Sequence, residues 1–181
     1  MFRKLMPLGL LFALGSFALT GAGQGPSSKS KHGKPKVDPA LAAAAKPLAT
    51  TGCDDSLSQH VYNPQRLQVV EKCIAVTGTI HHVKKEPDGD EHIQLTLDSG
   101  FSGLLNDKNN SAQATCLVVE PICQNAVTQT DAMAICRDFH SDVDIPKKGA
   151  HVRVLGAYVW DTESGHGWME IHPVTTIEVI E

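Results

Sequence analysis

The residues best suited to chemistry lie near the carboxyl end and recur at every second position: His166, Trp168, Glu170 and His172. Residues two apart on a β-strand point to the same face, so these side chains would share one side of a strand. Imidazole and carboxylate groups on one face can contribute to a divalent metal site. Such neighbours are about 7 Å apart, so a metal would need ligands from other strands. The alternative is structural, with Trp168 packed as a lid and Glu170 and His172 hydrogen-bonded across strands.

A second polar cluster runs from Asp88 to His92 and combines three carboxylates with an imidazole. At a hairpin tip these oxygens could hold Ca²⁺, although acidic turns are commonly just solvated. We therefore expect no resident metal or cofactor. Asp90 is a weak candidate metal ligand, as are His166, Glu170 and His172 of the first cluster.

The Asp-Gly-Asp sequence at 88–90, followed by alternating apolar residues, resembles the first hairpin of staphylococcal-nuclease-like OB enzymes. That family needs arginines near the following strand to neutralise the charge that develops on phosphorus. No Arg occurs between Arg66 and Arg137, and the chain has no Gly-x-Ser-x-Gly or phosphate-loop motif. These observations argue against a nuclease and favour a non-enzymatic protein.

Five segments have the alternation or β-branched content of strands, and one segment has helical periodicity. Apolar residues alternate from Ile74 to Ile80 and again from Ile93 to Leu97, around a turn at 86–90. Gly78 suits a bend within its strand, and Pro173 predicts an edge or a bulge. The predicted strands are 73–84, 91–98, 116–120, 151–160 and 168–179, and the predicted helix is 128–139.

This element order predicts a mainly β fold, a five-stranded OB-type Greek-key barrel with one helix between strands three and four. A small β-sandwich is the alternative.

The chain divides into three parts by composition. Residues 1–22 have the basic, apolar and small-residue order of a signal peptide, and a retained membrane anchor is the alternative. The composition of residues 23–52 predicts a disordered Lys/Ala/Pro-rich linker, with a possible short helix over 40–46. Residues 53–181 form the predicted OB-like domain. We expect a periplasmic or secreted protein with no transmembrane segment after signal cleavage.

The five cysteines fit an exported protein, in which disulfides are expected. Sequence locality favours a Cys53–Cys73 bridge and a Cys123–Cys136 bridge. A Cys116–Cys123 bridge would join a strand to its own end and looks strained, which leaves Cys116 free. No Cys-x-x-Cys pair supports a zinc site.

Charge is distributed unevenly along the chain. The part from Cys53 onward carries nine Lys and Arg against 19 Asp and Glu, whereas residues 23–52 carry five Lys and one Asp. An acidic domain repels a phosphate backbone, so we do not expect nucleic acid as the partner. The basic arm could tether the protein to anionic cell-envelope polymers, or serve only as a solvated spacer.

Residues 53–181 resemble a family of uncharacterised exported bacterial proteins with an OB-like domain. The most specific matching segment is His-Gly-Trp-Met-Glu-Ile-His-Pro at 166–173, and further matching segments lie at 53–57, 64–67, 86–93 and 104–106. The resemblance implies an OB-like fold and carries no known activity.

We therefore expect an exported, non-enzymatic binding module, with an oligosaccharide, peptide or protein ligand favoured over nucleic acid. OB folds bind on the face of strands two and three, which points to His92, Gln94 and Thr96, with the 166–172 cluster as a second patch. The alternative function is a metal-dependent hydrolase or nuclease-like OB enzyme that uses the His166, Glu170 and His172 face.

Overall fold

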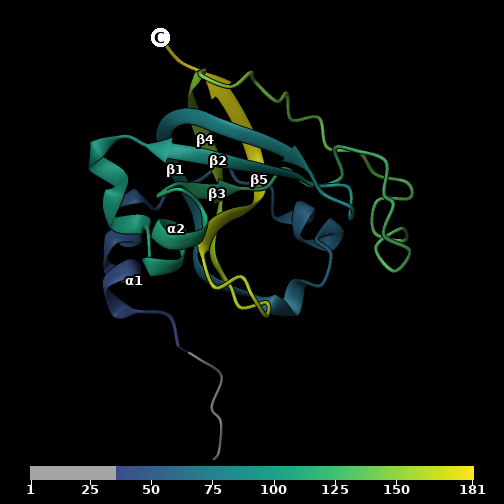
Figure 1. Ribbon diagram of the computed structural model, residues 1–181, viewed down its shortest axis with the longest axis horizontal. Helices are drawn as coiled ribbons and strands as arrows, with labels where there is room; N and C mark the ends of the chain where they lie inside the picture. Colours follow the sequence, from purple (N-terminus) through teal and green to yellow (C-terminus); the bar gives the residue numbers. More distant parts are fainter. Residues whose placement is uncertain (1–35) are drawn as a thin grey trace, which may run out of the picture. The chain divides into compact units, whose positions relative to one another are not determined.

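The computed structural model describes residues 36–181 of the chain (Figure 1). The predicted signal peptide at 1–22 and most of the basic arm lie outside this range. No helix among the described residues is long and apolar enough to cross a membrane.

The fold is mainly β, with one five-stranded sheet that closes in a ring in the order β1-β2-β3-β5-β4. Neighbouring strands are antiparallel except β3 and β5, which run parallel. Each of the five strands overlaps a predicted strand, although β1 begins six residues before the predicted start at 73. Their bounds are β1 Leu67–Lys85, β2 Glu91–Leu97, β3 Leu117–Val119, β4 His151–Asp161 and β5 Met169–Val179.

The inside of the ring holds the apolar core. Ile74, Val76 and Ile80 of β1 are buried, as their shared face predicts, and Ile93 and Leu95 of β2 meet them there. Burial at alternate positions is what a strand with one covered face requires, because successive side chains point to opposite sides.

The β4–β5 pairing contains an irregularity next to Pro173. The register runs from Gly156 opposite Val174 to Tyr158 opposite Ile171, which leaves Pro173 at a shift, as predicted. A Cβ at Gly156 would lie 2.4 Å from Ile171 Cγ2 and 2.5 Å from the Pro173 carbonyl oxygen. Only glycine therefore lets the two strands approach this closely, directly beside His172.

The compact unit begins at Lys36, well before Cys53, where the sequence places the start of the domain. Helix α1 (Pro39–Ala45) is capped by the Asp38 side chain and buries Leu41 and Ala45 in the core. Residues 36–52, expected to be part of a disordered linker, are thus ordered because this apolar helix face covers the ring.

The helix predicted over 128–139 does not form, and no helix lies between β3 and β4 within the described chain. Isolated turns take its place, with the backbone N–H groups of Thr128 and Gln129 both donating to the Pro87 carbonyl. These contacts and the Cys123–Cys136 disulfide hold the segment against the β1–β2 turn, which a continuous helix could not follow.

A helix missed by the sequence analysis, α2 (Asp107–Ala112), lies between β2 and β3 instead. Its first turn is closed by a capping box between Asn106 and Asn109. Figure 1 shows α1 and α2 toward one side of the strands, and the long β3–β4 connection toward the other.

Two disulfides tie irregular segments to the sheet. Cys53 bonds to Cys73 and Cys123 bonds to Cys136, the pairings that sequence locality favours. Cys116, the remaining cysteine, is free and buried in the described structure.

Candidate functional site

A polar cleft of about 600 Å³ opens over β2. Its walls are the β1–β2 turn on one side and the β4–β5 connection on another. The segment before β1 and residues next to β3 complete it. The side chains that line it include, along the chain, Arg66, Lys84, Glu86, Asp88, His92, Gln94, Gln113, Glu120, Glu163, His166 and Trp168. We call this site the polar cleft.

Three side chains form one hydrogen-bonded row along the polar cleft. His92 Nε2 lies 3.0 Å from Gln113 Oε1, and the same oxygen accepts from Gln94 Nε2 at 3.0 Å. His92 Nδ1 lies 2.8 Å from Glu120 Oε1, so both ring nitrogens face acceptors. Burial lowers the pKa of His92, but these acceptors outweigh burial and raise the pKa above its ordinary value. The row therefore fixes a ring that carries positive charge more readily than a free histidine.

An aromatic pair forms the wall contributed by the β4–β5 connection. The rings of His166 and Trp168 stack with centroids 4.2 Å apart. His166 Nδ1 lies 2.6 Å from Asp161 Oδ2, which also pairs with Arg66 Nη1. Trp168 is 8% exposed and His166 covers it, so the His166 ring is the surface that a ligand would touch.

Glu120 connects the polar cleft to the groups beneath it. Its Oε1 faces His92, and its Oε2 lies 2.9 Å from His172 Nδ1 and 3.9 Å from Arg66 Nη2. Burial alone would raise the pKa of Glu120, but hydrogen bonds from His172 and His92 outweigh burial and hold the pKa well below its ordinary value. Glu120 is therefore an ionised carboxylate shared among three cationic partners.

A hydrogen-bonded chain of side chains from Trp168 and the β5 residues Glu170 and His172 lies beneath the polar cleft. Trp168 Nε1 donates to Glu170 Oε2 at 2.9 Å, and Glu170 Oε1 lies 3.1 Å from His172 Nδ1. Glu170 and His172 are both almost fully buried. Burial and the neighbouring Glu120 charge raise the pKa of Glu170, so this carboxyl tends to keep its proton.

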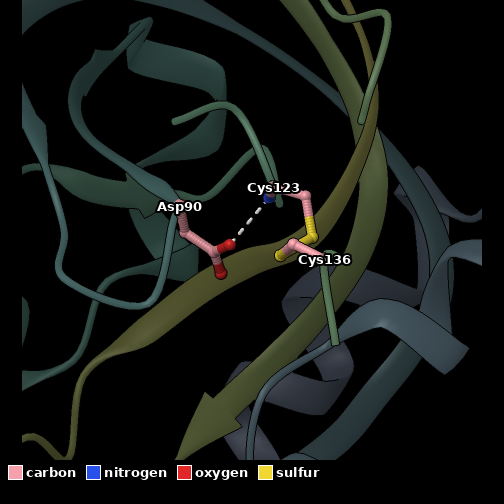
Figure 2. A group of neighbouring side chains, drawn as sticks. All are labelled: Asp90, Cys123 and Cys136. Carbon is pink, nitrogen blue, oxygen red and sulfur yellow. Dashed lines mark hydrogen bonds between the residues drawn. A yellow bond between two sulfur atoms is a disulfide. The ribbon is translucent and has the colours of Figure 1, made fainter. Parts of the chain in front are cut away.

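Asp90 lies on the far side of His172. Its Oδ1 accepts from the Cys123 backbone N–H at 2.9 Å (Figure 2). Its Oδ2 is 3.6 Å from His172 Nε2. Burial raises the pKa of Asp90 to about 7, against an opposing contribution from His172. Figure 2 also shows the Cys123–Cys136 disulfide beside this carboxylate.

The predicted ligand-binding residues divide into three groups. His92, Gln94, His166 and Trp168 line the polar cleft. Glu170 and His172 share a strand face with Trp168, as their spacing predicts, but lie beneath the cleft. Thr96 lies outside it, and its hydroxyl is 3.5 Å from Cys116 Sγ.

The weak metal candidates His166, Glu170 and His172 do not form one site. His166 faces Asp161, whereas His172 faces Glu120, Glu170 and Asp90. Ligand atoms of Asp90, Glu120 and His172 instead lie within 4.8 Å of one another. Glu120 and Arg66 were missed because they lie far from the motif in sequence, and only closure of the ring brings them to it.

Arg66 reaches the polar cleft from the segment before β1, although it lies 22 positions before the first residue of the Asp-Gly-Asp sequence. A nearby arginine is therefore present, contrary to the expectation from sequence spacing. It pairs with Asp161 and lies beside Glu120, so its charge is already compensated. The site consequently suits recognition of hydroxyl and amide groups better than of a phosphate.

Comparisons of the chain with protein-family models, with curated proteins and with solved structures find no match. The resemblance to uncharacterised exported bacterial proteins therefore stays a prediction.

Proposed function

We propose that this protein is an extracytoplasmic, OB-type binding module whose polar cleft holds a short oligosaccharide. One observation carries the proposal: the polar cleft lies over β2, between the β1–β2 turn and the β4–β5 connection. OB folds bind oligonucleotides and oligosaccharides on this face and between these two loops. The strand order β1-β2-β3-β5-β4 agrees with that fold.

The charge of the polar cleft favours a sugar over a nucleic acid. Its carboxylates are Glu86, Asp88, Glu120 and Glu163, and its permanent cations are Arg66 and Lys84. Both cations are already paired, with Asp161 and Glu86 respectively. Binding of a phosphate backbone depends on free Lys and Arg to replace its counterions.

The closed sheet argues against an extended peptide ligand. Peptides that bind by strand addition need a sheet edge with unpaired backbone groups. Each of the five described strands has a neighbour on both sides in the ring. The row of His92, Gln94 and Gln113 offers side-chain donors and acceptors instead, and His166 offers a flat ring.

An extracytoplasmic location is supported by the two disulfides, because such bonds persist in oxidising compartments.

Isothermal titration with neutral cell-wall-type oligosaccharides, such as N-acetylglucosamine oligomers, tests the proposal. We expect saturable binding that Gln94→Ala weakens about tenfold, because a hydrogen bond contributes roughly 0.5–1.5 kcal/mol. Gln68→Ala is the matched control, since Gln68 is a half-buried strand glutamine of β1 outside the polar cleft. Salt-sensitive binding of single-stranded oligonucleotide, with no response to any oligosaccharide, would contradict the proposal.

A further inference from the structure

The groups beneath the polar cleft contain more buried carboxylates than nearby cations. Asp90, Glu120, Asp161 and Glu170 are all at least nine-tenths buried. Arg66 pairs with Asp161, and the two remaining nearby bases are His92 and His172. Buried carboxylates must be paired, protonated or bound to a metal ion.

His172 has the arrangement of a metal-bound histidine. Its Nδ1 forms a hydrogen bond of 3.1 Å to Glu170 Oε1. Its Nε2 is fully buried and has no hydrogen-bond partner among the described residues. Metal-binding histidines typically donate one ring N–H to a carboxylate and present the other nitrogen to the ion.

The unpartnered nitrogen faces a carboxylate at a distance that suits a shared ion. His172 Nε2 and Asp90 Oδ2 are 3.6 Å apart, which is too long for a good hydrogen bond. Two ligands of a tetrahedral zinc ion, each about 2.1 Å from the metal, lie roughly 3.4 Å apart. One oxygen of Asp90, one oxygen of Glu120 and one ring nitrogen of His172 lie within 4.8 Å of one another.

We propose that Asp90, Glu120 and His172 bind one divalent transition-metal ion, best matched by Zn²⁺, beneath the polar cleft. With a neutral His172, the two positive charges of the ion offset the Asp90 and Glu120 carboxylates, and Arg66 offsets Asp161. Because Glu120 also lines the polar cleft, the ion lies next to the site of the proposed ligand.

The ligand set favours zinc over the hard cations. Ca²⁺ takes six to eight oxygen ligands and Mg²⁺ retains several waters, whereas one imidazole with carboxylates suits Zn²⁺. The neighbouring group of Asp90, Cys123 and Cys136 offers no alternative, because both sulfur atoms are joined in a disulfide (Figure 2).

The test uses the untagged full chain, stripped with chelator and titrated with ZnCl₂, with elemental analysis after dialysis. We expect one Zn²⁺ per chain. Asp90→Asn should weaken binding by about 100-fold or more, because loss of even an outer partner of a metal ligand costs 10–100-fold. The asparagine Oδ1 can still accept from Cys123 N–H, so the variant should fold.

Glu91→Gln is the matched control, because Glu91 is an adjacent buried carboxylate that contacts Asn125 and lies outside the site. This variant should bind zinc like the unchanged protein. Equal binding by Asp90→Asn would place the ion elsewhere, for example on the exposed His81 and His82, and would overturn the proposal.

X-ray absorption of the zinc-loaded unchanged protein gives a second readout that does not depend on the folding of any variant. The proposal predicts one imidazole with oxygen ligands. Two or more imidazoles, a sulfur ligand, or no retained zinc would overturn it. Oligosaccharide binding is measured separately, so failure here is distinguishable from failure of the proposed function.

Discussion

His172 is the residue on which the interior of the site depends. Three carboxylates from three different elements surround its ring, and two of them share its Nδ1. Removal of one partner from such a buried network leaves the others uncompensated, which costs several kcal/mol.

Stability should respond to pH through Asp90. Its pKa rises from 3.8 to about 7 on folding, so the folded state binds the proton more tightly between these values. The contribution of Asp90 to the free energy of unfolding is therefore fully present below about pH 4 and is lost as pH rises towards 7. The loss amounts to about 4 kcal/mol, at about 1.4 kcal/mol per pKa unit.

Asp90→Asn should remove this component, because the amide does not titrate. We expect the variant to gain up to about 4 kcal/mol relative to the unchanged protein on going from pH 4 to pH 8. Urea unfolding in the presence of chelator measures the difference. Parallel pH profiles for the two proteins would show that Asp90 ionises normally in the fold.

For the individual residues, the sequence predicts part of the site correctly. Alternation in the 166–173 motif correctly places Trp168, Glu170 and His172 on one strand face. It could not reveal that this face is covered, because Arg66, Glu120 and Asp161 come from distant segments. Periodicity reports which residues share a face, whereas burial depends on which other elements close over that face.

Among the elements, α1 shows how an apolar segment gains order from its neighbours. A helix of seven residues is marginal alone, but α1 buries Leu41 and Ala45 against the core. The composition of residues 23–52 suggests disorder because the short apolar stretch is averaged with the lysine-rich arm. The segment 128–139, which was predicted to be a helix but does not form one, is the opposite case, since a disulfide and backbone contacts override its helical period.

Leu41→Ala should therefore destabilise the whole domain. Leu41 is 8% exposed and packs in the main core, and such truncations typically cost 2–5 kcal/mol. Ala42→Ser, at an exposed position of the same helix, should change stability by less than about 0.5 kcal/mol. Urea denaturation followed by circular dichroism compares the two, and equal stabilities would show that α1 is not part of the core.

For the whole molecule, ring closure is what assembles the site. The alternating segments predict all five strands, and the closed order then brings the β1–β2 turn and the β4–β5 connection around β2. Acidic residues outnumber basic residues in the domain, and they also do so among the side chains that line the polar cleft. The disulfides fasten the irregular segments that local periodicity does not specify.

The central claim, that the polar cleft is a ligand-binding site, is tested most directly by NMR. Amide and indole resonances of the ¹⁵N-labelled protein would be followed during titration with N-acetylglucosamine oligomers. The account predicts saturable shifts confined to the walls of the polar cleft, including His92, Gln94 and the Trp168 indole, with the Gln68 amide unchanged. Shifts centred on another face, or none with any oligosaccharide, would contradict it.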